Sequence, residues 1–226
     1  MAILFVQHWG VVKNKEKEYE NFIMNTHMPV MEKLGLRAVG GFYVVVGAGP
    51  HIAAVSTTDN INDFTKIMTS AEYTQLLEQL FPLIMNYSSR LYVSYGPIEV
   101  KKYDIQFGMW RFNQYFDVIP GMAEEYKIFV RDRFIPEMER LGIKITNIWK
   151  AVVGSGPFIL SEGSSPGLQD IAKAIDTDEY RSLMRELKSK YIMNFQSRIM
   201  APTRRVEIPY FIKSMTTGLK NLTGGM

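Results

Sequence analysis

The sequence predicts an α+β fold made of two tandem units, each with the element order β-α-β-β-α-β, whose antiparallel sheets pack face to face as a barrel within one chain. Three observations predict it: an internal repeat, the same order of periodic segments in both copies, and apolar residues on both faces of the strands. Residues 19–52 align without a gap over residues 126–159, an offset of 107, and 13 of the 34 positions are identical. Such self-similarity indicates duplication of one structural unit.

The repeat extends beyond that block. Glu72-Tyr73 pairs with Glu179-Tyr180 at the same offset, and after one extra residue 84–87 pairs with 192–195 and Arg90 with Arg198. We therefore divide the chain into a first repeat, 1–101, a second repeat, 102–210, and a tail, 211–226, whose apolar spacing predicts a short amphipathic helix.

The elements follow from periodicity. Residues 2–11 alternate as a strand does, and 104–112 is the segment that we predict to be its counterpart. Apolar residues from 19 to 34 recur at helical spacing, Gly35 is a natural C-terminal stop, and Pro29 and Pro136 should kink the two equivalent helices.

The remainder of each unit is read in the same way. Segments 37–46 and 51–57 predict two strands around the glycine-rich turn 47–50, and 62–86 predicts a second helix before a strand at 90–95. This is the ferredoxin-like order, in which one face of a four-stranded antiparallel sheet carries both helices. The other face is apolar and uncovered, so the two sheets are expected to pack on each other.

Composition restricts the class of partner. Charged residues make up 22% of the chain, the net charge is only +3, and basic residues form no run, so we expect no nucleic-acid partner. A membrane-spanning helix needs about 20 apolar residues, and no stretch of this chain approaches that length, so no span is expected. The chain has no cysteine, which favours a cytoplasmic location.

The second helix and its exit, residues 70–84 with Arg90-Leu91, resemble the dimeric α+β barrel superfamily, particularly its NIPSNAP-like members. That superfamily includes cofactor-free monooxygenases, lactone isomerases, haem-binding enzymes and proteins without known activity. The resemblance implies that a haem-binding histidine would lie in the second repeat, but no histidine follows His51. The three histidines also lack metal-ligand spacing, so we expect neither a metal nor a bound cofactor.

Candidate site residues are sought where the copies differ. Aligned by predicted strand register, His8 matches Trp110 and Trp9 matches Arg111, with an insertion at 113–117. His8 is the candidate acid or base, and the alternative is a histidine hydrogen-bonded within the sheet. For the other two, His27 and His51, the sequence favours packing or a surface role.

The second repeat places Glu162 where the first has Val55. Burial would raise the pKa of this carboxyl and make it a usable base, although it could instead lie at a frayed strand end. Arg111 and Lys150 could hold an anionic substrate, or could be solvated strand ends. We expect Trp110, Trp149, Tyr43 and Tyr92 to line the barrel and bind a flat ligand, unless they are ordinary core.

Two functions remain open from the sequence. The first is a cofactor-independent enzyme, monooxygenase-like or isomerase-like, that acts on a small apolar or aromatic compound in the lumen with His8, Glu162 and Arg111 as catalytic residues. The second is a non-catalytic binding or assembly protein for a hydrophobic metabolite. The tail could cover the barrel mouth or dock on a partner subunit, so a homo-oligomer is possible.

Overall fold

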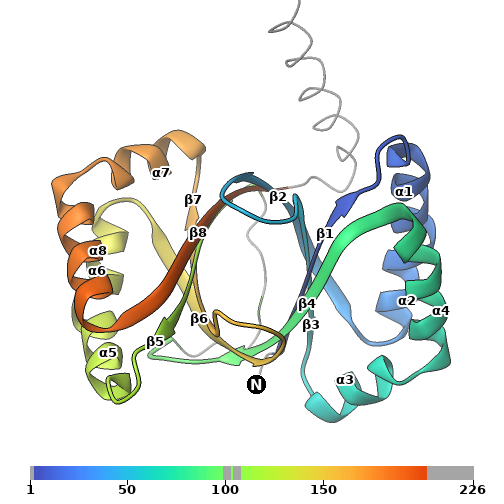
Figure 1. Ribbon diagram of the computed structural model, residues 1–226, viewed down its shortest axis with the longest axis horizontal. Coiled ribbons are helices and arrows are strands. Elements are labelled where there is room, and N and C mark those ends of the chain that lie inside the picture. The colour runs from blue at the N-terminus through green and yellow to red at the C-terminus, as the bar shows by residue number, and fades with distance from the viewer. Residues whose placement is uncertain (1–2, 99–102, 104–107, 203–226) are drawn as a thin grey trace, which may run out of the picture.

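The computed structural model describes residues 3–98, 103 and 108–202. Eight strands of this part close into one barrel in the order β1-β3-β2-β8-β5-β7-β6-β4. Helices cover the barrel on two opposite sides, one side from each repeat (Figure 1). The predicted intramolecular α+β barrel is therefore confirmed, and its lumen is enclosed by strands from both repeats.

The first half contains β1 to β4. Its elements, in chain order, are β1 (Ile3–Val11), α1 (Glu16–Phe22), the π-helical segment η1 (Ile23–His27), α2 (Met28–Lys33), β2 (Arg37–Val46), β3 (Ile52–Thr58), α3 (Ile61–Met68), α4 (Ala71–Leu80), the short 3₁₀ turn η2 (Phe81–Leu83) and β4 (Ile84–Ser94). The predicted first three strands agree with β1, β2 and β3 to within one residue.

The second half repeats this order. Its elements are β5 (Trp110–Val118), α5 (Ala123–Phe129), the π-helical segment η3 (Val130–Phe134), α6 (Ile135–Arg140), β6 (Lys144–Val153), β7 (Ile159–Ser165), α7 (Leu168–Ile175), α8 (Asp178–Lys190) and β8 (Ile192–Pro202). The strand predicted at 104–112 overlaps the observed one only at 110–112, because the strand that pairs with β7 and β8 is 110–118, and residues 104–107 lie outside the described part of the chain.

The first helix of each repeat contains a π-helical segment at the same place. In each copy the proline that we expected to kink the helix, Pro29 or Pro136, is the second residue after that segment. Proline has no backbone N–H to donate into the preceding turn, and a wider π turn is one way in which a helix accommodates the missing bond.

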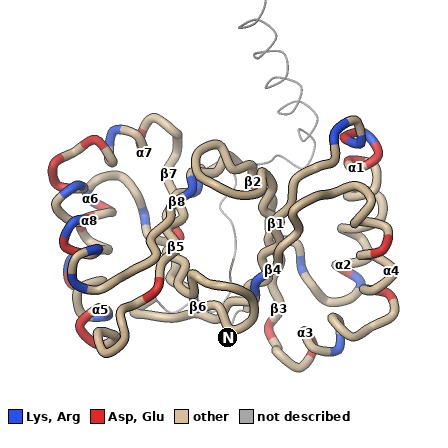
Figure 2. The backbone as a smooth tube through the Cα atoms, in the orientation of Figure 1, with Lys and Arg blue, Asp and Glu red and all other residues tan. Residues whose placement is uncertain are grey.

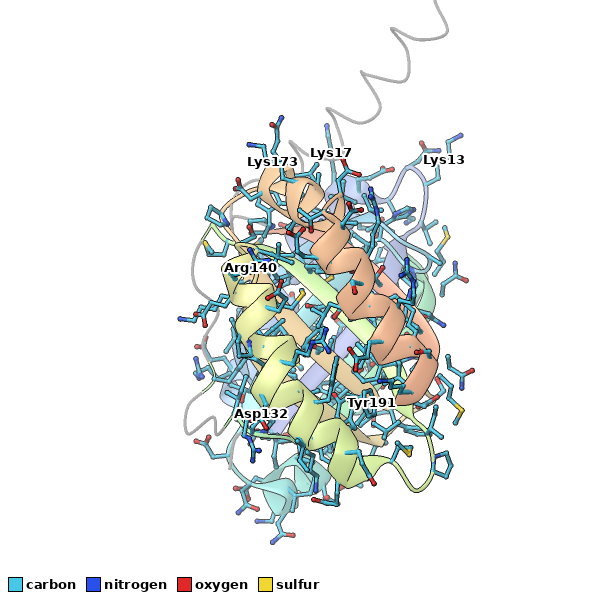
Figure 3. All side chains as sticks on the ribbon, turned by 90° about the vertical axis from the view of Figure 1, so that its left-hand side faces the viewer. Lys13, Lys17, Asp132, Arg140, Lys173 and Tyr191 are labelled. Carbon is cyan, nitrogen blue, oxygen red and sulfur yellow. The ribbon has the colours of Figure 1, made fainter. Side chains whose placement is uncertain are left out.

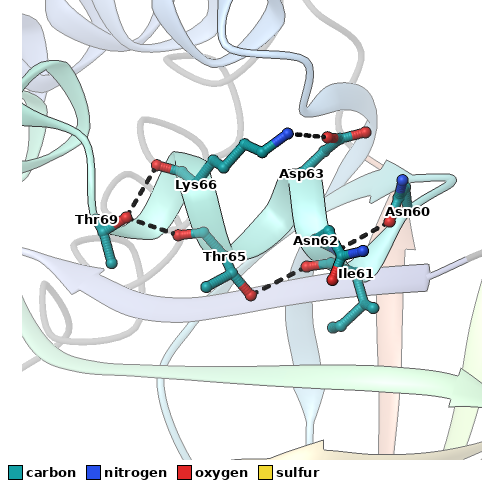
Figure 4. A network of polar contacts seen from close by, with 7 residues as sticks. All are labelled: Asn60, Ile61, Asn62, Asp63, Thr65, Lys66 and Thr69. Atoms are coloured by element: carbon teal, nitrogen blue, oxygen red, sulfur yellow. Dashed lines mark hydrogen bonds and ion pairs between the residues drawn. The ribbon is translucent and has the colours of Figure 1, made fainter.

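The second helix is shorter than predicted and is broken. In the first repeat it stops at Met68 and restarts after Ser70, whose Oγ accepts a hydrogen bond from the N–H of Tyr73 at 3.2 Å. Helix α3 is capped in turn by Asn60, whose Oδ1 accepts from the N–H of Asn62 at 2.8 Å (Figure 4). Residues 84–86, predicted to be helical, begin β4 instead, where Ile84 and Met85 pair with Val11 and Gly10 at the end of β1.

The interior forms three separate apolar clusters. One lies between the first sheet and α1 to α4, a second lies between the second sheet and α5 to α8, and the third lies inside the barrel between the sheets. The third cluster takes residues from all eight strands: Leu4, Val6, Phe42, Val44, Ala53, Val55, Tyr92, Tyr115, Trp149, Ala151, Leu160 and Met200, together with Tyr103. Both faces of each sheet are buried, as the sequence predicted.

Charged residues lie mainly on the helical layers at the two outer sides of the barrel (Figure 2). The view onto the second half shows the α5–α6 helix beside α8, with Asp132 and Arg140 on the outer surface (Figure 3). No helix among the described residues is long and apolar enough to cross a membrane. The predicted tail, 211–226, lies outside the described residues.

Candidate functional site

The side of each strand that faces the lumen follows from the three clusters. On β1, Leu4 and Val6 belong to the lumen cluster, whereas Ile3, Phe5 and Trp9 pack against the helices. His8 therefore faces the lumen, since successive side chains alternate across a strand. It is 4% exposed.

Strand register corrects the counterpart of His8. Ile3 pairs with Thr58 on β3, and Trp110 pairs with Ser165 on β7, so the offset of 107 continues through the first strands without an insertion. His8 is therefore equivalent to Tyr115, not to Trp110. By the same register Leu4, Val6 and Gly10 are equivalent to Arg111, Asn113 and Asp117.

Two of the four aromatic residues that we expected to line the barrel face the helices instead. Tyr43 packs in the cluster beneath the helices of the first half, and Trp110 packs against that of the second half. Trp149 and Tyr92 do lie in the lumen cluster. Lys150, proposed to hold an anion, is exposed, and its Nζ lies 5.6 Å from the ring centroid of Tyr95.

His8 is a buried, uncharged base in the free protein. Burial, and then the positive charges of Arg198 and Arg90, lower its pKa to about 3. Its Nε2 has no hydrogen-bond partner among the described residues. The imidazole is therefore uncharged at neutral pH, and one of its two ring nitrogens can accept a proton.

Arg90 and Arg198 converge beside His8 from the two halves of the barrel. Their guanidinium carbons lie 5.9 Å and 5.3 Å from the ring centroid of Tyr115, the lumen residue equivalent to His8. Arg90 Nη1 also donates to the hydroxyl of Tyr92 at 3.4 Å. Burial raises the pKa of Tyr92 to about 12, so this hydroxyl keeps its proton at neutral pH.

Glu162 faces the lumen, and its side chain is buried, at 4% exposure. Its carboxylate accepts hydrogen bonds from the Tyr103 hydroxyl at 2.5 Å, from Thr146 Oγ1 at 3.2 Å and from Trp149 Nε1 at 3.5 Å. Tyr103 is itself buried, and its ring meets that of Trp149 edge to face, with centroids 5.2 Å apart. Burial raises the pKa of Tyr103 well above its ordinary value, as does the negative charge of Glu162. Glu162 is thus an interior strand residue and not a frayed end.

Arg111 is also buried in the lumen, not solvated at a strand end. Its Nη1 donates to Thr146 Oγ1 at 3.3 Å, and its guanidinium carbon lies 5.7 Å from the centroid of the Phe42 ring. Its Nε, like Asn113 Oδ1 and Arg198 Nε, has no partner among the described residues. Burial of polar atoms without hydrogen bonds is costly, and a polar ligand in the lumen could supply partners for these groups.

The other two histidines lie away from the lumen. His27 is buried at the end of the π segment of helix one, where its ring centroid is 6.1 Å from that of Trp9, and burial lowers its pKa to about 4. His51 is exposed at the start of the hairpin strand. Both positions agree with the packing and surface interpretations.

Tyr103, Tyr115, Asn113 and the role of the arginine pair were not predicted from the sequence. Arg90 and Arg198 could have been identified from the sequence, because the repeat aligns them with each other and places each in the last strand of its unit. Tyr103 could not, since it precedes the second repeat's first strand and no pattern predicts that it enters the lumen.

Comparisons with known proteins establish the fold alone. No protein-family model matches the chain, and no curated protein sequence does. Among solved structures, a protein from Lactobacillus acidophilus NCFM that is provisionally named a monooxygenase has a TM-score of 0.57 at 11% identity, covering 89% of this chain and 93% of that chain. An anthrone oxidase-like protein has a TM-score of 0.58 at 13% identity, covering 90% and 91%. A haem-binding protein from Thermus thermophilus has a TM-score of 0.60 at 10% identity, covering 94% and 95%.

These structures share the barrel fold with this chain, while membership of the superfamily, and of its NIPSNAP-like part, stays a prediction. Proteins with this fold are named for different chemistry, so the site and not the fold has to carry the function. In this chain the second repeat, where the resemblance places a haem-binding histidine, has no histidine, and Tyr115 stands opposite His8. The residues present do not fit such a histidine-bound haem.

Proposed function

We propose that the protein is an enzyme that removes a proton from a small apolar or aromatic compound in the barrel lumen, with His8 as the base and without a bound cofactor. The observation that carries this proposal is the unpaired, uncharged imidazole of His8 beside the guanidinium groups of Arg90 and Arg198. The apolar lining around it, with Tyr92, Tyr115 and Trp149, suits a flat hydrophobic substrate.

The electrostatics of the site favour the anion that proton transfer leaves on the substrate. His8 Nε2 would accept the proton while the electron pair stays on the substrate as an enolate or carbanion. The nearby guanidinium groups stabilise that negative charge. The new anion in turn offsets the positive charges that lower the pKa of His8, so the imidazole gains proton affinity as the proton moves.

Two outcomes of this step correspond to the two reaction types. Return of the proton at another carbon of the substrate gives an isomer. Reaction of the anion with O₂ can instead convert a CH₂ group to C=O, with one O₂ consumed and one water released. The second reaction is the oxygenation of an anthrone, the compound named in one structural neighbour, and anthrone is therefore the first substrate to test.

Glu162 takes a positioning role in this proposal. Its carboxylate already binds Tyr103, Thr146 and Trp149, so it fixes the polar wall of the second repeat and is not a free base. Arg111, bound to Thr146, belongs to the same wall and contributes positive charge. This assignment replaces the expectation that Glu162 and Arg111 act directly on the substrate.

The test measures proton abstraction and oxygen consumption separately. Anthrone and related C–H acids are incubated with the full chain in D₂O, deuterium uptake is followed by NMR, and O₂ is followed with an electrode. Replacing His8 with Ala is expected to slow both by roughly 10²- to 10⁴-fold, the usual contribution of a positioned general base. His51→Ala, which changes an exposed histidine outside the lumen, is the matched control and should retain full activity.

Full activity of His8→Ala would exclude His8 as the base. Turnover that disappears on dialysis against EDTA would exclude cofactor independence. If no compound exchanges deuterium but native mass spectrometry shows a small molecule bound in the purified protein, the binding-protein alternative is favoured.

The proposal also covers the division of the chain into units and the location of the enzyme in the cell. We propose that the units are residues 1–101 and 102–210, that the tail from 211 is separate from both, and that the enzyme works in the cytoplasm. The support is the offset of 107 between strand registers and the absence of cysteine.

A further inference from the structure

We propose that Arg90 and Arg198 together form a carboxylate-binding site across the two repeats, and that the ligand of the lumen is an apolar or aromatic organic acid. This inference deepens the proposed function, on which it rests for the lumen as the place where the substrate binds. It narrows the apolar or aromatic compounds of that proposal to organic acids, and anthrone, which has no carboxylate, then serves only as a C–H acid that probes His8.

The two arginines are equivalent residues that meet at one place. Arg90 lies on β4 next to Val6 of β1, and Arg198 lies on β8 next to Asn113 of β5. Both guanidinium groups lie within 6 Å of the Tyr115 ring centroid, at 5.9 Å and 5.3 Å. Each guanidinium group carries forked N–H donors that match a carboxylate, so two of them beside one ring place several such donors in the same part of the lumen.

Each arginine is held by the glycine turn of the opposite repeat. Arg90 Nη2 donates to the carbonyl oxygen of Gly156 at 3.0 Å. Arg198 lies against Gly49, where a Cβ atom would come 2.5 Å from Nη2, and the φ of +109° at Gly49 also favours glycine. Contacts with these turns thus hold both arginine side chains in place, which lowers the entropy cost of ordering them when a ligand binds.

The described residues contain no carboxylate that neutralises this pair. Their ion pairs all lie on the helical layers and include neither Arg90 nor Arg198. Glu162 is bound by Tyr103, Thr146 and Trp149, and Asp117 is bound by the N–H of Phe158 and by Asn194 Nδ2.

A second observation points to a ligand at the same place. Arg198 Nε is a buried donor without a partner, and so is Arg111 Nε, which also faces the lumen. A cation in an apolar surrounding is stabilised by an anion that also satisfies its donors. A carboxylate does both, and an apolar or aromatic body attached to it would contact Tyr92, Tyr115 and Trp149, which belong to the lumen cluster.

The experiment compares an acid with its uncharged isostere. Binding of 1-naphthoate and 1-naphthamide to the full chain is measured by isothermal titration calorimetry at low salt. We expect the wild-type protein to bind the acid at least about tenfold more tightly, because hydrogen bonds to a charged group are the stronger ones. Arg90→Gln and Arg198→Gln should each weaken naphthoate binding about tenfold and leave naphthamide binding unchanged.

Arg140→Gln is the matched control, because Arg140 lies on the outer surface of α6 (Figure 3). It should bind both compounds as the wild type does. Circular dichroism and the unfolding midpoint check that the variants fold. If a lumen variant does not fold, the preference of the wild type for acid over amide still decides the question.

Equal affinity of the wild type for acid and amide overturns the inference, and so does an acid preference that survives in the Arg90→Gln/Arg198→Gln double variant. These results are distinct from failure of the proposed function. If His8→Ala keeps full turnover while naphthoate binding depends on the arginines, the carboxylate site stands and the assignment of the base falls.

Discussion

The two repeats agree on the side of the first strand that faces the helices and differ on the side that faces the lumen. Toward the helices, Phe5 and Gln7 of β1 recur as Phe112 and Gln114 of β5. Toward the lumen, all compared positions change in chemical type: Leu4, Val6, His8 and Gly10 become Arg111, Asn113, Tyr115 and Asp117. The helical layer needs the same packing in both copies, whereas a single lumen needs each function only once. The lumen-facing positions at which the two repeats differ therefore indicate where the candidate functional site lies.

Equal truncations beneath the helices should have equal effects. Met31 and Met138 are equivalent and almost fully buried, at 1% and 0% exposure. Each change to Ala removes the same buried side chain and leaves a cavity, so the free energy of unfolding should fall by about 3 kcal/mol in either variant. Urea denaturation of both gives the comparison. A loss in one copy more than twice that in the other would contradict the view that the helical layers are equivalent.

Replacing a lumen residue of the second repeat by its equivalent in the first should lower the free energy of unfolding. Glu162→Val introduces the residue found at the equivalent position 55, but it leaves the buried Tyr103 hydroxyl and Trp149 Nε1 without their acceptor. We expect a loss of about 2 kcal/mol in the free energy of unfolding. Glu162→Gln keeps an acceptor oxygen and is the control, with a smaller loss. A stabilised Glu162→Val protein would show that Tyr103 does not depend on this carboxylate.

The pH dependence of stability should come from the two buried histidines, both in the first repeat. The pKa of His8 is lowered to about 3 and that of His27 to about 4. An unfolded imidazole binds a proton below about pH 6.5, so the unfolded state holds more protons than the folded state in the window below that value. Stability is therefore full above pH 6.5 and is lost as the pH falls through the window.

The size of this effect is up to about 1.4 kcal/mol per pH unit for each histidine. Denaturation series between pH 7 and pH 5 should show a shallower decline in His8→Gln and in His27→Gln than in the wild type. His51→Gln should keep the wild-type slope, since His51 is exposed. If the slopes of all three variants equal that of the wild type, the histidines are not the source.

The smallest effect concerns a tyrosine pair under the helices. Tyr19 accepts a hydrogen bond from Trp9 Nε1 at 2.9 Å, whereas the equivalent Tyr126 hydroxyl has no partner among the described residues because Phe116 replaces the tryptophan. Tyr19→Phe should cost about 1 kcal/mol of unfolding free energy, and Tyr126→Phe should be close to neutral. Thermal unfolding of the two variants measures the difference. Equal losses would mean that the Trp9 contact contributes nothing.

Much of the fold was determined by local sequence. The repeat, the strand at 37–46 and the order of elements follow from spacing and from glycine turns, which act between neighbours in the chain. Burial of both sheet faces could also be predicted, since Phe42 and Tyr43 are both apolar in character and adjacent. The barrel then follows, because an apolar sheet face without helices has to be covered by its copy.

Which face of each strand enters the lumen was decided only by tertiary structure. When both faces are buried, alternation does not distinguish Tyr43, which packs under the helices, from Phe42, which lines the barrel. The pairing of β5 with β7 and β8 fixed the register that places Tyr115 opposite His8. Register depends on contacts between strands far apart in the sequence, and a shift of one residue exchanges every lumen residue for a helix-facing one. The sequence alone therefore determined the barrel, and the closure of its eight strands decided that buried His8 and half-buried Arg90 and Arg198 face its lumen.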